Sequence, residues 1–244
     1  MLKKVIFSTV SLFLLGGYVS KLKLSLIPIL CFGAILVLTG LTQRHALACE
    51  FIEYSNYSEI APNIFVSSSF NLDQKETLLS TITLGKSRVN TTFGKMISNP
   101  KVVITTNESE AADFGSNAYG KALLTPLGQC IVIGHKGQNI DVIAHEYTHA
   151  EVHHRVGWLN HFLNVPIWFN EGVALLVDYR NLYLLENIDL SLKDIESVKN
   201  NRFDFSLASY QASRVLVDSI DKSSLYGNLE KLKQGQDLNS VFGL

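Results

Sequence analysis

The residues of this 244-residue chain that are best suited to chemistry lie in one short run, His145-Glu146-Tyr147-Thr148-His149. This run is an H-E-x-x-H motif. In a helix, residues i and i+4 lie on one face, one turn apart, so two imidazoles placed there can reach one zinc ion. Glu146 lies beside that face, where its carboxylate can take a proton from a water molecule that the metal activates. The motif therefore predicts a metal site that carries its own base.

A catalytic zinc site also needs a third protein ligand and an open position for water. The extended motif with a third histidine is absent, because Arg155 stands at that position. Glu171 is the alternative, since it lies among mostly apolar residues in the segment Pro166–Tyr179, which is expected to be the next helix. An unpaired carboxylate is costly there, and a bound metal ion offsets that cost. We therefore expect one zinc ion, held by His145, His149 and Glu171.

Together these features resemble a known family, the gluzincin metallopeptidases, and above all the compact bacterial peptidase MA-like domains. The resemblance rests on two motifs, His145-Glu146-x-x-His149 and Pro166-x-Trp168-Phe169-Asn170-Glu171-Gly172-x-Ala174, and it covers about residues 60–244. It implies that the two histidines and the downstream Glu171 bind zinc and that Glu146 is the catalytic base. It also implies a peptidase that hydrolyses peptide bonds through a metal-activated water.

Other polar residues are secondary candidates. Tyr210 resembles a tyrosine that stabilises the oxyanion in related gluzincins, a catalytic role that suits a phenol donor; a tyrosine in the helix core is the alternative. Asp141 lies one turn before His145, where it could accept a hydrogen bond from the His145 ring, but an ordinary acidic residue without a role at the site is the favoured interpretation. His153 continues the face of the two histidine ligands. Because three histidines of one helix cannot all reach one tetrahedral metal, we expect His153 to support the site from outside or to face solvent.

The elements that position these residues follow from the apolar patterns. Strands are expected at Ile64–Ser67, Lys101–Thr105 and Gln129–His135, and helices at Asn71–Phe93, Asn139–Val156, Pro166–Tyr179 and Ser206–Ile220. Because strands come first and helices follow, the pattern indicates an α+β fold with helices packed on one small sheet. The resemblance implies a zincin-like (gluzincin) domain, in which a small mixed sheet is followed by an active-site helix and a C-terminal helical region. The strand over 130–134 is expected to pair with an extended substrate.

The first 48 residues differ from the rest, because they contain five basic residues and no acidic one. Leu24–Leu41 is an uncharged apolar run long enough to cross a membrane, and Val5–Val19 is a shorter apolar run. We expect residues 1–48 to be a membrane anchor or signal segment with one or two hydrophobic helices. A zinc metallopeptidase-like domain is expected over residues 49–244.

The sequence leaves two orientations open. If only the second apolar run spans, the lysines before it stay in the cytoplasm and the body lies outside; if both runs span, the body returns to the cytoplasm. The small-x-small run Ala46–Ala48 favours an extracytoplasmic body, either periplasmic or extracellular. Cys49 and Cys130 also favour it, because a disulfide between them requires an oxidising compartment. Two free thiols are the alternative.

The composition excludes several classes of protein. At 47% hydrophobic and 18% charged residues, the chain is unlike a disordered protein. After residue 48, sixteen basic residues face 22 acidic ones, so the body is unsuited to binding nucleic acid through phosphates. The expected partners are a peptide or protein substrate and the membrane. Two other interpretations stay open: a zinc-binding module without peptidase activity, and a metal-free membrane-bound interaction protein.

Overall fold

The computed structural model describes residues 43–124, 128–200 and 205–244. It divides into two units, Met1–Leu47 and Ala48–Leu244, and helix α2 (Arg44–Glu50) crosses that boundary. We call the second of these the main unit. The predicted membrane segment falls mostly on residues 1–42 and so lies outside the described residues. Within the described ranges, the structure has no helix that is both long and apolar enough to cross a bilayer.

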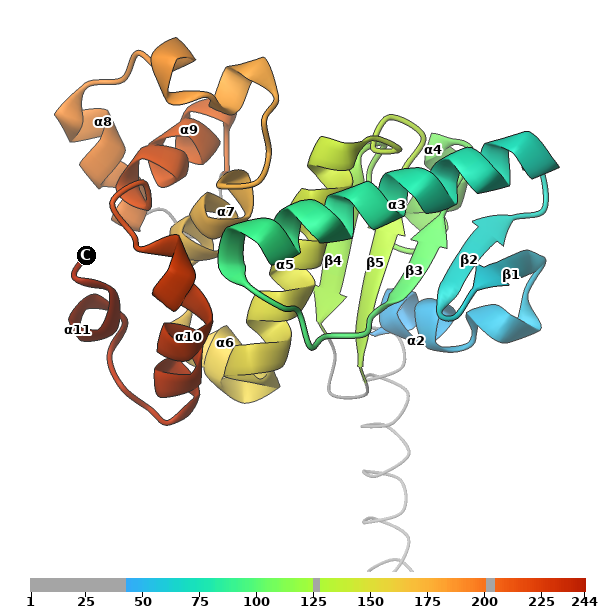
Figure 1. Ribbon diagram of the computed structural model, residues 1–244, viewed down its shortest axis with the longest axis horizontal. Coiled ribbons are helices and arrows are strands. Elements are labelled where there is room, and N and C mark those ends of the chain that lie inside the picture. Colours follow the sequence, from blue (N-terminus) through green and yellow to red (C-terminus); the bar gives the residue numbers. More distant parts are fainter. Residues whose placement is uncertain (1–42, 125–127, 201–204) are drawn as a thin grey trace, which may run out of the picture. The chain divides into compact units, whose positions relative to one another are not determined.

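The main unit contains a mixed sheet, in which five strands are described (Figure 1). In chain order they are β1 (Tyr57–Ala61), β2 (Ile64–Ser67), β3 (Lys101–Ile104), β4 (Gly120–Leu124) and β5 (Gln129–Ile133). Their spatial order is β1-β2-β3-β5-β4; the three central strands are parallel, whereas β1 and β4 pair antiparallel at the two edges. The central strands are continuous apolar runs because both faces of the sheet are covered.

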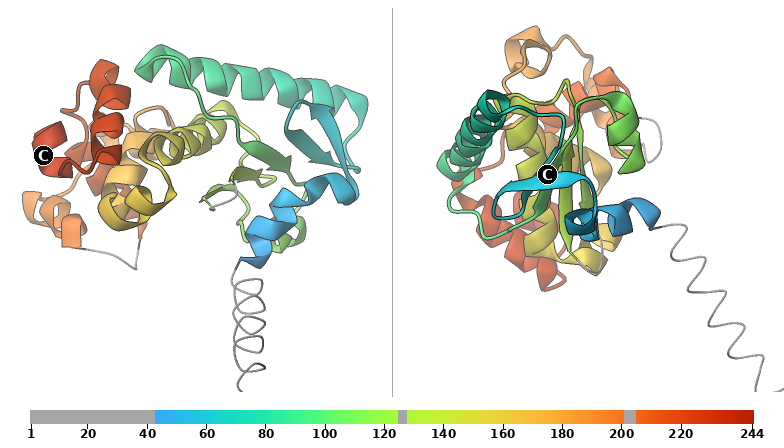
Figure 2. Two further views of the ribbon diagram at one scale, coloured as in Figure 1. Left: turned by 90° about the horizontal axis from the view of Figure 1, so that it is seen from below. Right: turned by 90° about the vertical axis from the view of Figure 1, so that its right-hand side faces the viewer.

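The helices complete an α+β fold, as the sequence predicts. Two long helices, α3 (Leu72–Phe93) and α5 (Ile140–Val156), pack against each other along the sheet (Figures 1 and 2). The shorter α-helices are α4 (Glu108–Asp113), α6 (Trp158–Asn164), α7 (Ile167–Leu175), α8 (Leu192–Ser197), α9 (Leu207–Leu216), α10 (Leu225–Lys233) and α11 (Leu238–Phe242). Single 3-10 turns are η1 (Ile52–Tyr54), η2 (Asn181–Tyr183), η3 (Leu185–Asn187), η4 (Val198–Asn200) and η5 (Lys222–Ser224).

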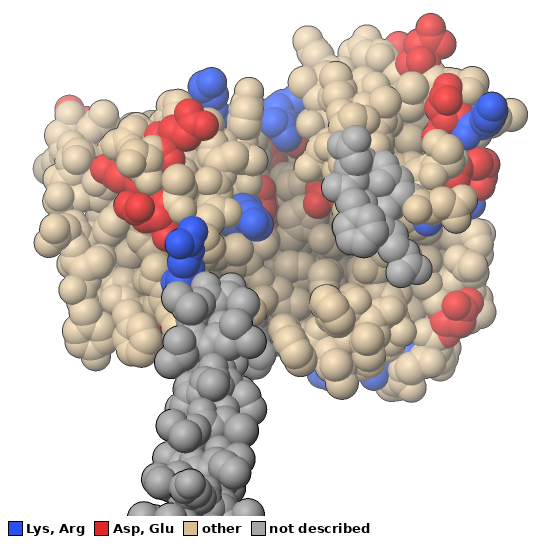
Figure 3. All heavy atoms as spheres, turned by 180° about the vertical axis from the view of Figure 1, so that it is seen from behind, with Lys and Arg blue, Asp and Glu red and all other residues tan. Residues whose placement is uncertain are grey.

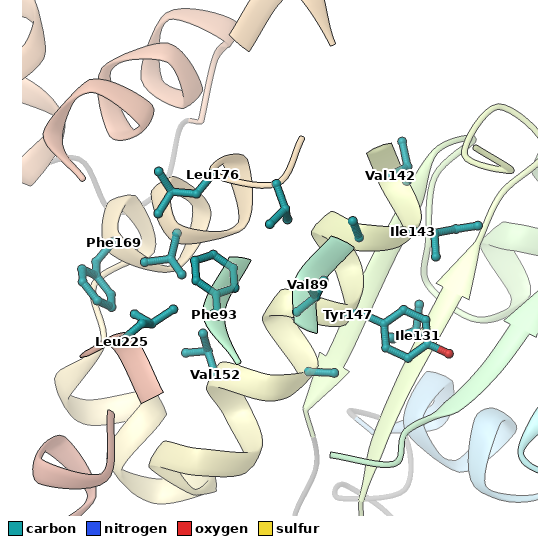
Figure 4. Close-up of a cluster of buried hydrophobic side chains, with 14 of the residues drawn as sticks. Val89, Phe93, Ile131, Val142, Ile143, Tyr147, Val152, Phe169, Leu176 and Leu225 are labelled. Atoms are coloured by element: carbon teal, nitrogen blue, oxygen red, sulfur yellow. The ribbon is translucent and has the colours of Figure 1, made fainter. Parts of the chain in front are cut away.

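The hydrophobic core lies on both faces of the sheet. The larger cluster joins one face to α3, α5, α7 and α10, and Figure 4 shows Phe93 of α3 and Phe169 of α7 within it. The smaller cluster covers the other face and contains Cys49 and Cys130, which the structure joins in a disulfide. The bond fixes the start of the main unit to the second residue of strand β5. Helix α5 lies between the sheet and the C-terminal helices, and it contacts β4 and β5 on one side and α7 and α10 on the other.

Most of the predicted elements are confirmed, with changes at their ends. The long helices begin at side-chain caps, Asn71 for α3 and Asn139 for α5, as their patterns indicate. The helix expected over Pro166–Tyr179 ends earlier, at Leu175. Strands β1 and β4 and helices α4, α6 and α8 are not among the predicted elements. In β1 and β4 the side chains are only partly buried, which leaves little apolar alternation to detect.

The expected role of residues 130–134 as the substrate-pairing strand is wrong. β5 lies between β3 and β4, and its backbone pairs with both neighbours. It therefore has no free edge for a peptide. Among the described residues, β4 forms the edge of the sheet on this side.

We predict that Gly172→Ala destabilises the main unit. A Cβ atom on Gly172 would lie 2.5 Å from the Ser213 carbonyl oxygen, so α7 and α9 would have to separate. Overpacking of this kind typically costs about 1–3 kcal/mol. The matched control is Gly227→Ala in α10, where an added Cβ atom would have no atom of the described residues within 4 Å apart from its chain neighbours and the backbone of its own helix. Chemical unfolding should show a loss for the first variant and no loss for the second, and equal stabilities would contradict the close packing.

We also predict that the disulfide contributes measurably to stability. Cys49 and Cys130 are 81 residues apart in sequence, so the bond closes a long loop in the unfolded chain. Removing such a bond typically costs about 2–4 kcal/mol. In urea unfolding, the midpoint of the double variant Cys49→Ala/Cys130→Ala should be well below that of the oxidised protein. The midpoint of the reduced protein should be close to that of the double variant. An unfolding midpoint that does not change on reduction would contradict the prediction.

Candidate metal centre

Helix α5 positions the H-E-x-x-H residues by burying nearly its whole surface. Val142 and Ile143 on one side pack into the core shown in Figure 4. His145, Glu146 and His149 are also buried, and they line a cavity of about 460 Å³ rather than the core. A helix that is buried all round has no solvated face for its polar groups, so these three must satisfy one another or a ligand.

Helix α7 supplies the third polar group of the cluster. Trp168 and Phe169 fix α7 in the core, and Gly172 lets it approach α9 closely. Glu171 then faces α5, where its Oε2 lies 3.4 Å from His145 Nε2 and 3.4 Å from His149 Nε2. The two Nε2 atoms are 3.0 Å apart. The structure thus brings together all three residues that the sequence predicts as metal ligands.

The spacing of these three atoms fits one small cation. Ligand atoms about 2.0–2.2 Å from a tetrahedral metal ion are about 3.3–3.6 Å from each other. The observed separations of 3.0, 3.4 and 3.4 Å are close to that range. Two imidazole nitrogens and one carboxylate oxygen, all within 4.8 Å of one another, form a donor set that could hold a metal ion.

The charges of the cluster are mutually compensating. Burial alone would lower the pKa of His145, but hydrogen bonding to Asp178 and Glu171 raises it to about 10. Burial would raise the pKa of Glu171, but His149 and His145 hold it well below its usual range. The carboxylate of Glu171 is therefore ionised, which is the form that ligates a metal.

Glu146 lies on the strand side of the cluster. The backbone amide of Ala122 donates a hydrogen bond to its carboxylate, and Gly120 leaves room for it, since a Cβ there would lie 3.1 Å from Glu146 Oε1. Burial raises the pKa of Glu146 above its usual value, although His145 and His149 act in the opposite direction. A carboxylate with a raised pKa is suited to accepting and returning a proton.

Asp178, which belongs to no motif in the sequence, lies behind the first candidate ligand, His145. Its Oδ2 lies 3.5 Å from His145 Nδ1, and its carboxylate accepts a 2.8 Å hydrogen bond from Arg180 Nε. Burial would raise the pKa of Asp178, but Arg180 and His145 lower it to about 2. A carboxylate on the far ring nitrogen of a metal-binding histidine fixes the orientation of that ring. The only signal in the sequence is a lone acid after the apolar run of α7.

Asp141, for which that supporting role is the less favoured alternative, has other partners. It forms an ion pair with Arg88 of α3 and accepts the backbone N–H of Tyr179 at 3.1 Å. These contacts tie α3 and the segment after α7 to the start of α5. Asp141 therefore does not support the His145 ring, and the favoured interpretation, a residue without a role at the site, agrees with these contacts.

Tyr210, on α9, lines the same cavity as Glu146 and Glu171. Its ring packs edge-on against Phe205, with centroids 5.0 Å apart. Burial raises its pKa, and the negative charges of Glu171 and Glu146 add to the shift, so the phenol keeps its proton. The structure thus brings Tyr210 to the cluster as a neutral hydrogen-bond donor.

His153 does not face solvent. It is buried, it stacks near His149, and its ring lies edge-on to that of His161 on α6 with centroids 4.0 Å apart. Burial lowers the pKa of both rings, that of His161 to about 4. Both are therefore neutral near pH 7, and they extend the row of imidazoles from α5 to α6.

The cavity opens between the sheet and the C-terminal helices. Figure 3 shows a hollow there with acidic side chains inside it. Its walls include Gly120, Lys121 and Ala122 of β4 on one side and Asn170, Glu171 and Tyr210 on the other. Comparisons of the chain with protein-family models, with curated proteins and with solved structures give no match. What the site does must therefore follow from its own geometry and chemistry.

We predict that Asp178→Asn weakens metal binding. The amide cannot stabilise the His145 ring as a carboxylate does, and loss of such a partner typically costs about 10–100-fold in metal affinity. Asp141→Asn is the matched control, because Asp141 precedes His145 by one turn but binds Arg88 instead. Competition with a chromogenic chelator for Zn²⁺ gives both affinities. Equal affinities for the two variants would contradict the assigned role of Asp178.

Proposed function

We propose that this chain is a zinc-dependent peptidase with a zincin-like (gluzincin) domain. The observation that supports this best is the convergence of His145, His149 and Glu171 in one buried cluster, with Glu146 beside it in the same cavity. Two imidazoles, a carboxylate and an open side form the donor set that catalytic zinc sites use. Neither an interaction module nor a structural protein requires a buried base next to such a set.

The chemistry divides between the bound ion and the side chains. When bound, one zinc ion polarises the carbonyl group of a substrate and makes a water molecule more acidic. Glu146 accepts the proton of the attacking water and then donates it to the leaving amine, for which its raised pKa is suited. The neutral phenol of Tyr210 donates a hydrogen bond to the oxygen on which negative charge develops.

The edge strand β4 supports a peptide as the substrate. Among the described residues its outer edge has no partner strand, and Gly120, Lys121 and Ala122 line the cavity that contains the metal cluster. An extended peptide added to this edge would have its backbone hydrogen-bonded along the cavity.

We also propose that residues 1–48 anchor the protein to a membrane and that the main unit is extracytoplasmic. The uncharged apolar run before the main unit supports the anchor. The disulfide between Cys49 and Cys130 supports the location, because such bonds persist in oxidising compartments.

Glu146→Gln tests the peptidase assignment. The amide keeps the shape of the side chain but cannot accept a proton, so cleavage of a peptide library, read by mass spectrometry, should fall by about 10²–10⁴-fold or more. Zinc content should stay close to one ion per chain. His149→Ala and Glu171→Ala should instead lose most of the zinc along with the activity.

The same measurements separate the other interpretations. Zinc in the wild-type protein without any cleavage that depends on Glu146 would indicate a binding module. A wild-type protein without zinc, purified in the absence of chelators and unable to bind added zinc, would contradict the metal site altogether.

A further inference from the structure

Helix α6 exposes large apolar side chains of the kind that a helix normally buries. None of its seven residues, all of them described, is buried. The exposed fractions are 44% for Trp158, 57% for Leu159, 77% for Phe162 and 63% for Leu163. We call these four residues the apolar face of α6. At 100° per residue they cover an arc of about 140° on one side of the helix.

The polar residues of α6 hold this face outward. Asn160 Nδ2 donates a 3.0 Å hydrogen bond to the Lys233 carbonyl of α10. The ring of His161 packs against that of His153 on α5. A surface helix of a globular protein normally turns its apolar stripe to the core and its polar side to water, so α6 has the opposite arrangement. A contiguous exposed apolar patch of this kind marks a surface that contacts something else.

The surroundings of the apolar face suit a lipid surface. Helix α6 carries no charged residue, and Ile167 at the start of α7 extends the exposed apolar surface. Lys231 and Lys233 are exposed in the last turn of α10, next to α6. Figure 3 shows a tan surface below the hollow, with basic side chains along its lower margin. Aromatic and aliphatic side chains bordered by lysines are typical of helices that lie in the headgroup region of a bilayer.

The chain itself indicates which surface is within reach. The predicted membrane span ends at Leu41, and Cys49 is fixed to β5 by the disulfide. The seven residues between them extend over about 25 Å at most. In Figure 1, α6 lies on the lower side of the main unit, as does the end of α2 that belongs to this unit. The tether therefore keeps a bilayer that holds the N-terminal segment within about 25 Å of Cys49, at the start of the main unit.

We propose that the apolar face of α6 inserts into the headgroup region of the bilayer that holds the N-terminal segment, with Lys231 and Lys233 against anionic headgroups. The partner is a lipid surface, not a second protein. The inference rests on the predicted anchor and on the exposed face, and it does not depend on peptidase activity.

The two tryptophans of the chain allow a direct test, because Trp158 belongs to the apolar face and Trp168 is only 4% exposed. The full chain is reconstituted in vesicles of phosphatidylcholine and phosphatidylglycerol, with or without brominated phosphatidylcholine, which quenches tryptophan on contact. We expect brominated lipid to quench roughly half of the emission, that of Trp158, since interfacial tryptophans lie at headgroup depth. The variant Trp158→Phe, which keeps Trp168, should lose most of this quenching.

A second variant guards against a change in folding. Phe162→Trp in the Trp158→Phe background should regain the quenching, because residue 162 is the most exposed of the apolar face. Equal quenching of the wild-type protein and Trp158→Phe would overturn the proposal. Unquenched Trp158 in a chain that cross-links to a second copy would overturn it in favour of a protein partner, and failure of the chain to float with the vesicles would also overturn it. None of these measurements uses cleavage of a peptide.

Discussion

Four ionisable side chains lie next to one another, largely buried, at one end of a cavity, and the packing of the surrounding helices and strands keeps them there. His145, Glu146, His149 and Glu171 converge from two helices. Isolated charges in such surroundings would be expensive, whereas imidazoles facing carboxylates compensate one another. Asp178 and Arg180 continue this compensation behind His145. The helices must therefore hold these groups at fixed separations, because displacement of one group leaves the charge of another unpaired.

Close backbone approach provides the required rigidity. Gly172 allows α7 to lie against α9, and Gly120 allows β4 to pass directly beside Glu146. Arg88 and Asp141 join α3 to the first turn of α5 from the other side. The candidate metal ligands thus come from helices that are packed on both sides, while the open side of the cluster faces the cavity. A site that is rigid at its ligands and open toward an edge strand is preorganised for a substrate.

The candidate metal ligands could be predicted from the sequence because their residue types and spacing are local features. The spacing of His145 and His149 fixes their common face, and a lone Glu171 in an apolar helix requires a counter-charge, so the ligands could be inferred without a fold. The choice between Asp141 and Asp178 could not, because it depends on the path of the chain after α7 ends. Strand β4 was missed because its short run, partly buried, lacks β-branched residues. The sequence does not predict helix α6 because its seven residues are too few for a helical period to stand out, and the sequence does not show which side of it faces solvent.

Helix α6 also connects its exposed apolar face with the cavity that holds the candidate metal ligands. His161 of α6 packs on His153, which lines the cavity beside the metal cluster. Both rings are neutral and buried, so the contact is a packing contact rather than an ion pair. Any surface that holds the outer face of α6 therefore restrains the inner face next to the cavity. If that surface is a bilayer and the cavity is a peptidase site, as proposed, the contact between α6 and α5 links the membrane-bound face to the site, and the expected substrates are chains that emerge from, or lie along, the same membrane.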